Sequence, residues 1–254
     1  MKKIGIIGCG WLGIRLAEKL VLNNTVYATT TSEEKLQLLQ SKGLNPSVIN
    51  FSEIQSHEAF AEWEDTEPFS VLIITVPLFS KRVAESIIET RIENLLAFVG
   101  NFKEQIFLMS STGVYPDVAR ELTEADLPYE NVQSEFRLKN QCPQLNILRL
   151  AGLMGDNRQL SNYKVSNPEA PVNHVHYADV CATIELMISQ QLHDKLYNIV
   201  APNHPSKTDV INAQTGIGTG QLQHTEGRII SSQKIIAELN YTFKYPDPRY
   251  FHLK

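Results

Sequence analysis

The sequence predicts an α/β fold, a doubly wound parallel sheet with a small C-terminal lobe. β-rich segments alternate with segments whose apolar residues recur at helical spacing, which is the pattern of strand–helix–strand units. Residues 71–76 are apolar on both faces of a predicted strand, as a parallel strand covered by helices on both sides requires. The 254 residues are 43% hydrophobic and 20% charged, which is ordinary for a globular protein.

The first thirty residues form one strand–helix–strand unit. Residues 3–7 are a predicted strand that leads directly into a glycine-rich turn. Leu12, Leu16 and Leu20 then recur at helical spacing. Residues 25–30 form a second β-rich run, so the helix connects two predicted strands.

Further elements follow along the chain. Thr31 and Glu34 have the spacing of a capping box, and Gly43 marks the end of the helix that they begin. The remaining predictions are strands at 47–51, 71–76, 106–109, 146–150 and 196–200 and helices at 81–99 and 178–190. Residues 152–173 are rich in Gly, Asn, Ser and Pro and predict a loop. The last fifty residues give mixed signals that favour a smaller lobe.

Gly8, Gly10 and Gly13 follow the first strand with the spacing GxGxxG. In such a turn the first glycine allows the tight bend, the second lets the backbone approach a pyrophosphate, and the third lets the helix pack on the strand. The phosphates then lie at the helix N-terminus, where free amides favour negative charge. The alternative is a plain βα turn, but the flanking strand and helix match the dinucleotide-binding fingerprint.

These observations predict a dinucleotide-binding Rossmann domain over residues 1–154. A smaller substrate-binding lobe is predicted over residues 155–254, of which about 172–200 return to the Rossmann sheet. Beside the three glycines, we expect the cofactor to lie against Trp11, Leu12, Thr30, Thr31, Ser32, Val76 and Pro77.

The end of the second strand decides between NAD and NADP. An acidic residue there would hold the ribose 2′-hydroxyl of NAD, but this chain has threonine and serine over residues 29–32. Thr31, Ser32 and Lys35 can donate to a 2′-phosphate, and no carboxylate would repel it. The segment has no arginine, the usual partner of a 2′-phosphate. We predict NADP, with NAD as the alternative.

A cluster of hydroxyl groups, Ser110, Ser111 and Thr112, follows the predicted strand 106–109. Ligands of an open parallel sheet bind beyond the C-terminal ends of its strands. The cluster is therefore expected to face the nicotinamide end of the cofactor. Turn chemistry is the alternative, because serine and threonine readily bond to backbone groups in loops.

The segment SSTGVYP (110–116) resembles the active-site serine segment of the extended short-chain dehydrogenase/reductase superfamily, in its NAD-dependent epimerase/dehydratase type. Three later segments agree in order and spacing, namely ILRLAGLMG (147–155), NHVHYADV (173–180) and YNIVAP (197–202). Residues 227–249 resemble the C-terminal tail of a bacterial subgroup of epimerase-like proteins. The resemblance covers nearly the whole chain and implies a nicotinamide cofactor and a hydroxylated small-molecule substrate.

Two features depart from that family's pattern. Ile7 stands where the family usually has the first glycine of GxxGxxG. The family also has a catalytic tyrosine with a lysine four residues later, which lowers the tyrosine pKa so that the phenol can exchange a proton. After the serine segment, the nearest candidate is Tyr129, with Gln133 in the lysine position; alignment on Glu135 instead places Leu127 and Asn131 at the two sites.

The resemblance assigns to Ser111 a hydrogen bond with a substrate hydroxyl or carbonyl. Thr112 is its neighbour and could substitute for it, and Tyr129 is the candidate for proton transfer. Because the activating lysine is missing, Tyr115, Tyr163 and Lys164 remain alternative proton donors.

His174 and His176 point the same way on an extended segment, with Asp179 nearby. Two such histidines could bind a metal, but no third ligand has a suitable spacing. We predict no metal site.

Three functions fit these observations. The first is an NAD(P)-dependent reductase or epimerase/dehydratase that acts by hydride transfer on a hydroxylated small molecule such as a sugar nucleotide. The second is a non-catalytic NADP-binding protein, a redox sensor or assembly partner, which the missing Tyr–Lys pair favours. The third is a dehydrogenase of the hydroxyacid type, which would need a long helical second domain that the sequence does not show. We predict the first, with the second as the alternative.

Charge and cysteine content set the expected surroundings. The formal net charge is −5 and no arginine-rich run is present, so no nucleic-acid partner is expected. No segment is apolar over a length that spans a bilayer. Three cysteines, an odd number, do not make a disulfide framework. We expect a cytoplasmic protein with a small-molecule substrate, and the sequence is compatible with a homodimer.

Overall fold

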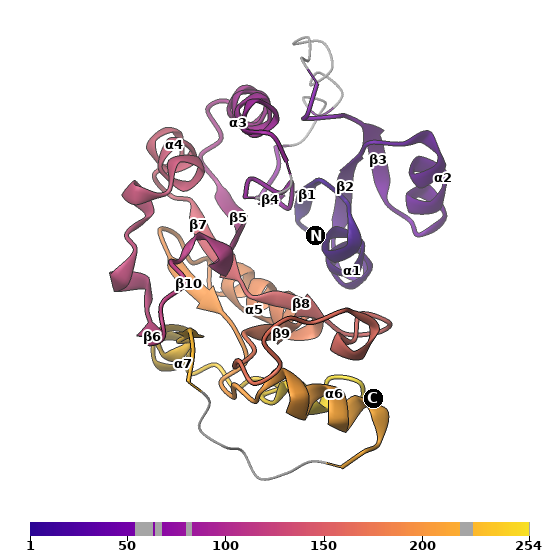
Figure 1. Cartoon of the computed structure of the whole chain (residues 1–254). Coiled ribbons are helices and arrows are strands. Elements are labelled where there is room, and N and C mark those ends of the chain that lie inside the picture. Colours follow the sequence, from indigo (N-terminus) through magenta and orange to yellow (C-terminus); the bar gives the residue numbers. More distant parts are fainter. Residues whose placement is uncertain (54–62, 64–67, 80–82, 219–225, 254) are drawn as a thin grey trace. The chain divides into compact units, whose positions relative to one another are not determined.

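The computed structural model describes residues 1–53, 63, 68–79, 83–218 and 226–253. Its main sheet consists of β1 (Lys3–Ile7), β2 (Thr25–Thr30), β3 (Asn45–Val48), β4 (Val71–Ile74), β5 (Gln105–Ser111), β7 (Asn146–Leu150) and β10 (Leu196–Ile199). The strand order is β10-β7-β5-β4-β1-β2-β3 (Figure 1). The pairs β1–β2, β2–β3, β1–β4 and β4–β5 are parallel. This arrangement confirms the predicted fold class.

The helices are α1 (Trp11–Leu20), α2 (Glu33–Ser41), α3 (Glu85–Val99), α4 (Gln133–Gln141), α5 (Tyr177–Ser189), α6 (Lys207–Thr215) and α7 (Gln233–Leu239). α3 and α4 lie side by side, because Glu89 accepts hydrogen bonds from Gln133 and Arg137. α1 lies on the opposite side of the sheet (Figure 1), where Lys19 pairs with Glu185 of α5. Within the described parts of the chain, none of the helices is both long and apolar enough to cross a membrane.

β1 and β4 form the centre of the core. Every residue of both strands is buried, and for β4 this agrees with the prediction of a strand that is covered on both faces. Chain order reverses at β1, since β2 and β3 lie to one side of it and β4 and β5 to the other. Such a switch point leaves a crevice beyond the C-terminal strand ends, where α/β sheets bind their ligands.

Several predicted bounds differ from the structure. The third strand is Asn45–Val48 and not 47–51, β4 ends at Ile74 and not at 76, and β5 continues to Ser111. α3 begins at Glu85; residues 83 and 84 are not helical, and the predicted start at 81–82 lies outside the described residues. The predicted loop 152–173 contains the short strand β8 (Gly152–Met154) and a 3₁₀ turn.

The helix cap predicted at Thr31 lies one residue later. Ser32 is the N-cap of α2, and its side chain accepts a hydrogen bond from the Lys35 amide at 3.3 Å. Pairing of β2 with β3 continues through Thr30, so the chain can leave the sheet only at Thr31. The cap therefore falls on Ser32, the residue after Thr31, which also has a hydroxyl group.

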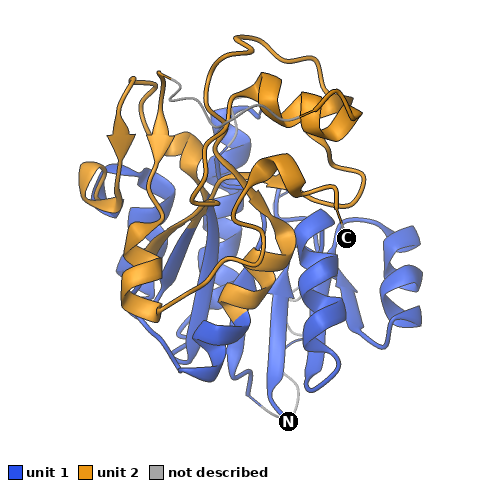
Figure 2. Ribbon diagram, turned by 90° about the horizontal axis from the view of Figure 1, so that it is seen from below, with its two compact units in different colours: residues 1–110, 129–148, 185–195 blue, residues 111–128, 149–184, 196–254 orange. Residues whose placement is uncertain are grey.

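The chain divides into two compact units (Figure 2). The first unit comprises residues 1–110, 129–148 and 185–195, and the second comprises residues 111–128, 149–184 and 196–254. The second unit contains two small parallel sheets, β6 (Glu121–Leu122) with β11 (Ile229–Ile230) and β8 with β9 (His174–His176). The boundary that the sequence predicts near residue 154 stays a prediction.

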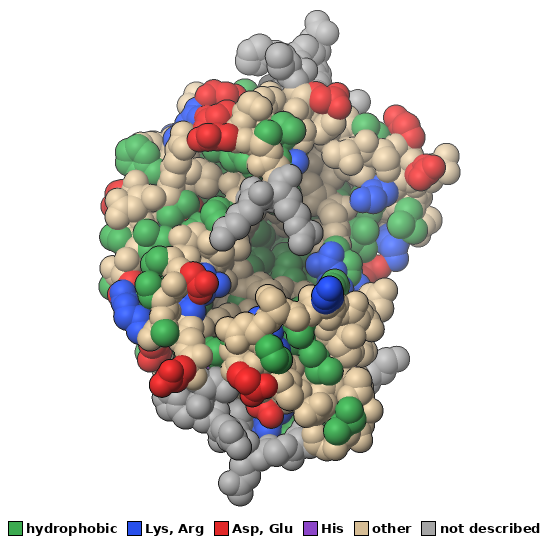
Figure 3. Space-filling view, viewed as in Figure 1, with side chains coloured by type: hydrophobic (Ala, Val, Ile, Leu, Met, Phe, Trp, Pro, Cys, Tyr) green, Lys and Arg blue, Asp and Glu red, His purple; other side chains and the backbone are tan. Residues whose placement is uncertain are grey.

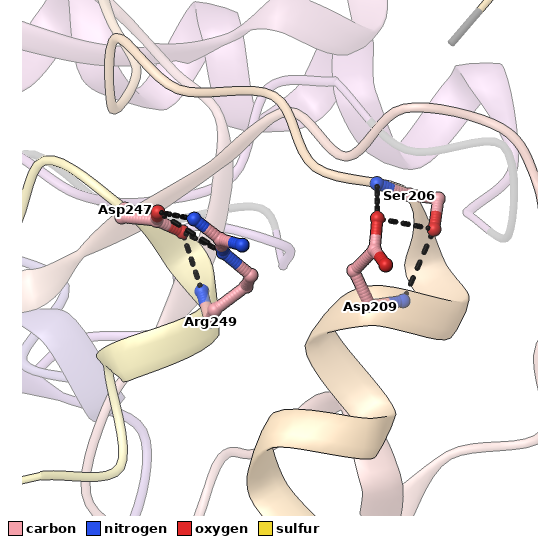
Figure 4. Close-up of polar contacts among 4 residues, drawn as sticks. All are labelled: Ser206, Asp209, Asp247 and Arg249. Carbon is pink, nitrogen blue, oxygen red and sulfur yellow. Dashed lines mark hydrogen bonds and ion pairs between the residues drawn. The ribbon is translucent and has the colours of Figure 1, made fainter. Parts of the chain in front are cut away.

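Local hydrogen bonds fix the C-terminal part of the second unit (Figure 4). Ser206 caps α6 in a capping box, in which its hydroxyl accepts from the Asp209 amide while the Asp209 carboxylate accepts from the Ser206 amide. Asp247 and Arg249 form a buried ion pair, with the nearest nitrogen and oxygen 2.7 Å apart. A buried pair of this kind restricts the local backbone because both charges must keep their partners.

Charges of both signs are spread over the face drawn in Figure 3, where Lys and Arg side chains are interspersed with Asp and Glu. Neither sign dominates the described part of this face.

Candidate cofactor-binding site

The glycine turn after β1 has the geometry that its spacing predicts. Gly8 has a φ of +95°, and a Cβ atom there would lie 2.8 Å from a methyl carbon of Val76. A Cβ atom at Gly13 would lie 2.9 Å from the Gly8 carbonyl oxygen. A Cβ atom at Gly10 would meet nothing within 4 Å. Gly8 and Gly13 are therefore required by the fold, whereas the space at Gly10 is open for a ligand.

Thr29 and Thr75 hold the turn against the neighbouring strands. The Gly8 amide donates to the Thr29 hydroxyl at 2.7 Å, and the Cys9 amide donates to the Thr29 carbonyl at 2.7 Å. The Thr75 hydroxyl donates to the Gly8 carbonyl. The backbone of the turn is fixed on both sides, so its open face is preorganised.

A pocket of about 580 Å³, partly open to solvent, lies at the C-terminal ends of the first four strands. Its lining is formed by Gly8, Cys9, Gly10, Thr29, Thr30, Thr31, Lys35, Ile49, Asn50, Phe51, Ser52, Thr75, Val76, Pro77 and Arg91. All of these residues belong to the first unit. The pocket lies at the switch point of the sheet, as the rule for ligand sites in such folds requires.

Six of the predicted cofactor residues line this pocket: Gly8, Gly10, Thr30, Thr31, Val76 and Pro77. Four others do not. Leu12 and Gly13 are buried in the first turn of α1, Ser32 caps α2, and the Trp11 ring lies 3.8 Å from the Arg15 guanidinium. The first-turn amides of α1 have no acceptor within the helix, so contact through the backbone stays a prediction for Trp11, Leu12 and Gly13.

Thr30 carries an unsatisfied hydroxyl group. Its side chain is 4% exposed, and its oxygen has no hydrogen-bond partner in the described part of the protein. An unpaired buried hydroxyl costs on the order of 1–3 kcal/mol. Because Thr30 lines the pocket, a ligand that bonds to this hydroxyl would recover that energy.

Arg91 is a pocket residue that the sequence did not reveal. It lies on α3, and its side chain donates to the Ser52 hydroxyl at 2.9 Å and to the Pro77 carbonyl at 2.8 Å. It therefore reaches the pocket that Lys35 lines from α2. Nothing in the local pattern around Arg91 signals this, since only the folded sheet brings the start of α3 beside the ends of β3 and β4.

Cys9 lies in the turn but has no reactive character. Its side chain is buried, and burial raises the pKa of its thiol to about 12. The thiolate is the nucleophilic form of cysteine, so Cys9 serves as a small packing residue.

The hydroxyl cluster after β5 has three different environments. The Ser110 hydroxyl donates to the fully buried Glu135 carboxylate at 2.5 Å. The Ser111 oxygen accepts from the Gly113 amide at 3.0 Å, as a cap of the turn Thr112–Val114. The Thr112 hydroxyl is buried and donates to the Leu150 carbonyl at 3.4 Å. Ser111 is thus both a turn residue and a residue whose own O–H can still be donated.

Tyr129 lacks the activation that the family's tyrosine has. Partial burial and the neighbouring Glu130 carboxylate raise the pKa of its phenol above the usual value. The Lys139 ammonium group lies 6.0 Å from the ring centre and pairs with the Asp194 carboxylate. A raised pKa does not activate a tyrosine for proton transfer near neutral pH, and the assignment of Tyr129 as the proton donor stays a prediction.

Tyr115, an alternative donor, belongs to a buried hydrogen-bond network in the second unit. Its hydroxyl donates to Asn198 at 2.9 Å and accepts from Arg149 at 2.9 Å. Glu124 completes the network through the Asn198 amide at 2.6 Å. Burial raises the pKa of Tyr115. Its hydroxyl is already engaged as donor and acceptor, which is a structural role.

Other candidate donors lie on the surface or near the chain end. Tyr163 and Lys164 are exposed. Tyr250 and Lys254 have the Tyr-x-x-x-Lys spacing, but Tyr250 lies in the 3₁₀ turn Pro248–Tyr250 and Lys254 lies outside the described residues. Neither pair belongs to α4, the helix that follows the serine segment, and α4 itself carries no Tyr–Lys pair.

His174, His176 and Asp179 are tied to other protein groups. The Asp179 carboxylate accepts from Tyr241 and from the amides of Lys244 and Tyr245. The His176 ring stacks on Tyr245 at a centroid distance of 3.8 Å. Over the described residues, no group of three or more His, Cys, Asp and Glu side chains is placed to hold a metal ion.

No protein-family model matches the chain. The chain is 26% identical over 274 aligned residues to Protein YeeZ from Escherichia coli K12, and the alignment covers 98% of both proteins. Among solved structures, it is similar to a UDP-glucuronic acid 4-epimerase from Bacillus cereus in complex with NAD, with a TM-score of 0.74, 14% identity and coverage of 98% and 95% of the two chains. It is also similar to vestitone reductase from alfalfa, with a TM-score of 0.72, 14% identity and coverage of 99% and 96%.

These likenesses establish the class of fold. The chain shares its fold with a UDP-glucuronic acid 4-epimerase and a dTDP-glucose 4,6-dehydratase, both solved in complex with NAD, and with vestitone reductase. The resemblance seen in the sequence is confirmed at this level. A conserved protein of unknown function from Silicibacter pomeroyi also shares the fold, with a TM-score of 0.67, 17% identity and coverage of 99% and 96%.

Proposed function

We propose that this protein binds a nicotinamide dinucleotide, NADP in preference to NAD, and acts as a reductase or epimerase/dehydratase on a hydroxylated small molecule such as a sugar nucleotide. The observation that carries the proposal is the open space at Gly10 within a turn whose backbone is otherwise fixed. The fold supports it, because two of the epimerase and dehydratase structures that share the fold are complexes with NAD.

The described residues fit such a cofactor. The first-turn amides of α1 would hold the pyrophosphate, and Gly10 leaves the room that it needs. The orphaned Thr30 hydroxyl and the two cations Lys35 and Arg91 would bind the adenosine end. When bound, the nicotinamide supplies hydride transfer, chemistry that no side chain of this protein can perform.

The remaining chemistry falls to the protein's own side chains. Ser111 can donate its O–H to a substrate oxygen while its lone pair accepts from Gly113. Ser110 is held by Glu135, which fixes the start of the hydroxyl cluster. Tyr129 stays the predicted group for proton transfer, although partial burial and Glu130 raise the pKa of its phenol.

The first test is calorimetric titration of the purified protein with NADPH, NADP⁺, NADH and NAD⁺. The proposal expects tight binding of the NADP pair and weaker binding of the NAD pair. If none of the four binds, the glycine turn is only architectural and the proposed function is wrong.

A second candidate is a non-catalytic NADP-binding protein, a redox sensor or assembly partner. It is favoured by the absence of a Tyr–Lys pair on α4 and by the raised pKa of Tyr129. A screen of sugar nucleotides with the bound cofactor separates the two candidates, because only the enzyme converts them. A reductase oxidises NADPH and lowers its absorbance, whereas an epimerase or dehydratase returns the hydride and is detected by the changed sugar nucleotide in chromatography and mass spectrometry or NMR.

Ser111→Ala tests the enzymatic role directly. If the enzyme proposal holds, turnover should fall by roughly 10²-fold or more while NADPH affinity stays the same, because one positioned hydrogen-bond donor contributes on that scale. Ser70→Ala is a suitable control, since Ser70 precedes β4 outside the hydroxyl cluster. Equal turnover of Ser111→Ala and the wild type would show that Ser111 is a turn residue only.

A further inference from the structure

Arg91 places a positive charge in the pocket, and no carboxylate lines that pocket among the residues that the structure describes. Its hydrogen bonds go to neutral acceptors, the Ser52 hydroxyl and the Pro77 carbonyl. Among the described residues that line the pocket, none is acidic. A cation held by neutral partners keeps its full attraction for an anionic ligand.

The orientation of Arg91 leaves some N–H donors of its guanidinium group available to a ligand. Its Nε and one terminal nitrogen make the two hydrogen bonds to the protein. A guanidinium group has five N–H donors in a planar arrangement, and within the described part of the chain the second terminal nitrogen makes no hydrogen bond, so its donors can reach a ligand. Burial lowers the pKa of Arg91, but arginine stays charged at neutral pH.

Thr30, the last residue of β2, and Lys35, in the first turn of α2, line the same pocket. Lys35 adds a second cation, and the buried Thr30 hydroxyl has no hydrogen-bond partner among the residues described. The pyrophosphate of a dinucleotide is already accounted for by the glycine turn and the N-terminus of α1. Two cations and a free hydroxyl therefore remain for another compact anion on the adenosine end.

We propose that Arg91 and Lys35 form a second anion site that binds the phosphate ester on the adenosine ribose and so selects NADP over NAD. This inference rests on the proposed function and adds the residue that determines cofactor choice. It also explains why the segment after β2 can lack an arginine, because the arginine comes from α3.

A stacking role for Arg91 is the rival explanation. A guanidinium plane that is fixed by two hydrogen bonds could lie on the adenine ring. Stacking would strengthen every adenine nucleotide equally, whereas an anion site strengthens only those that carry the extra phosphate. The two explanations therefore differ in what they predict for 2′,5′-ADP and 5′-AMP.

The experiment titrates the full-length wild type, Arg91→Gln and Arg91→Lys with 2′,5′-ADP, 5′-AMP, NADPH and NADH by calorimetry. The wild type should bind 2′,5′-ADP about tenfold or more tightly than 5′-AMP, as a charge-assisted contact to phosphate implies. Arg91→Gln should remove most of that difference and leave 5′-AMP unchanged, while Arg91→Lys should retain part of it. Arg120→Gln is the matched control, because Arg120 is exposed and lies outside the pocket.

Two outcomes overturn the inference. Equal loss of 2′,5′-ADP and 5′-AMP binding in Arg91→Gln would show stacking, and unchanged selectivity in that variant would show no role. In both cases the wild type still binds dinucleotides, so the proposed function survives. If Arg91→Gln does not fold, the salt dependence of the wild type decides, because the anion site requires 2′,5′-ADP to weaken more steeply with salt than 5′-AMP.

Discussion

Gly10 and Gly43 show that two glycines in one Rossmann domain can be needed for different reasons, one for ligand space and the other for backbone conformation. Neither would bring a Cβ atom within 4 Å of another group. Gly10 has ordinary backbone geometry and faces the pocket, whereas Gly43 has a φ of +77° after α2 and lies outside the pocket. A side chain at Gly10 would therefore obstruct a ligand, and a side chain at Gly43 would strain the backbone.

Gly10→Val should reduce NADPH affinity by roughly 10²-fold or more, because a branched side chain would occupy the space of the pyrophosphate. Gly43→Val should retain affinity and lower the free energy of unfolding by about 1–2 kcal/mol. Calorimetry and denaturant unfolding of both variants measure the two effects. Unchanged nucleotide affinity in Gly10→Val would contradict the cofactor site.

His174 ties stability to pH in the second unit. Its ring lies against Gly152, where an added Cβ atom would be 2.7 Å from the ring, and burial lowers the pKa of His174 to about 4. Because the usual value is 6.5, the unfolded chain binds the proton more readily than the folded chain. The stabilising contribution of neutral His174 is present above pH 6.5 and is lost as the pH falls towards 4.

We expect His174→Gln to reduce the acid sensitivity of folding. The wild type should lose up to about 3 kcal/mol from this residue between pH 6.5 and 4, and the variant should not. Urea unfolding at several pH values measures the difference, with the exposed His193→Gln as the control. If both variants follow the wild-type pH curve, His174 does not titrate in this way.

Among the elements, local sequence rules succeeded where local contacts decide the bounds. β1, β2 and β7 have the predicted bounds, because each is a short apolar or β-branched run between polar turns. The predicted ends of the third and fifth strands were wrong, since the pairing of neighbouring strands decides where a strand stops. The glycine turn could be predicted because all its requirements lie within six residues.

Ser206 caps α6, a helix that the sequence did not predict, and its substitution measures how much one helix cap contributes to stability. α6 has nine residues, and the buried Ser206 hydroxyl satisfies the Asp209 amide at 3.0 Å. Ser206→Ala should lower the free energy of unfolding by about 1–2 kcal/mol. Chemical denaturation measures this loss, with the exposed Ser166→Ala as a control that should stay within about 0.5 kcal/mol of the wild type. Equal stability of the two variants would rule out a contribution from the cap.

At the scale of the whole molecule, the fold could be predicted from the sequence but most of the adenosine end of the site could not. The alternation of elements and the glycine spacing are local patterns, which can be recognised without any knowledge of tertiary contacts. Arg91, Ser52 and Asn50 line one pocket only because the fold brings α3 close to the segment that follows β3. No local spacing rule connects such residues, which is why the arginine of the pocket was missed.

Cys9, Cys142 and Cys181 are all buried and form no disulfide bond, so their labelling can be used to measure how often the protein opens. Burial raises the pKa of Cys9 and Cys142, so the native protein presents neither access nor thiolate to an alkylating reagent. Labelling at neutral pH should then proceed only through transient unfolding, and its rate would report how often each unit opens. Cys9 and Cys142 lie in the first unit and Cys181 in the second. Mass spectrometry of the three labelled peptides would therefore follow the two units separately in one unmodified chain, and NADPH should slow the labelling of Cys9 first.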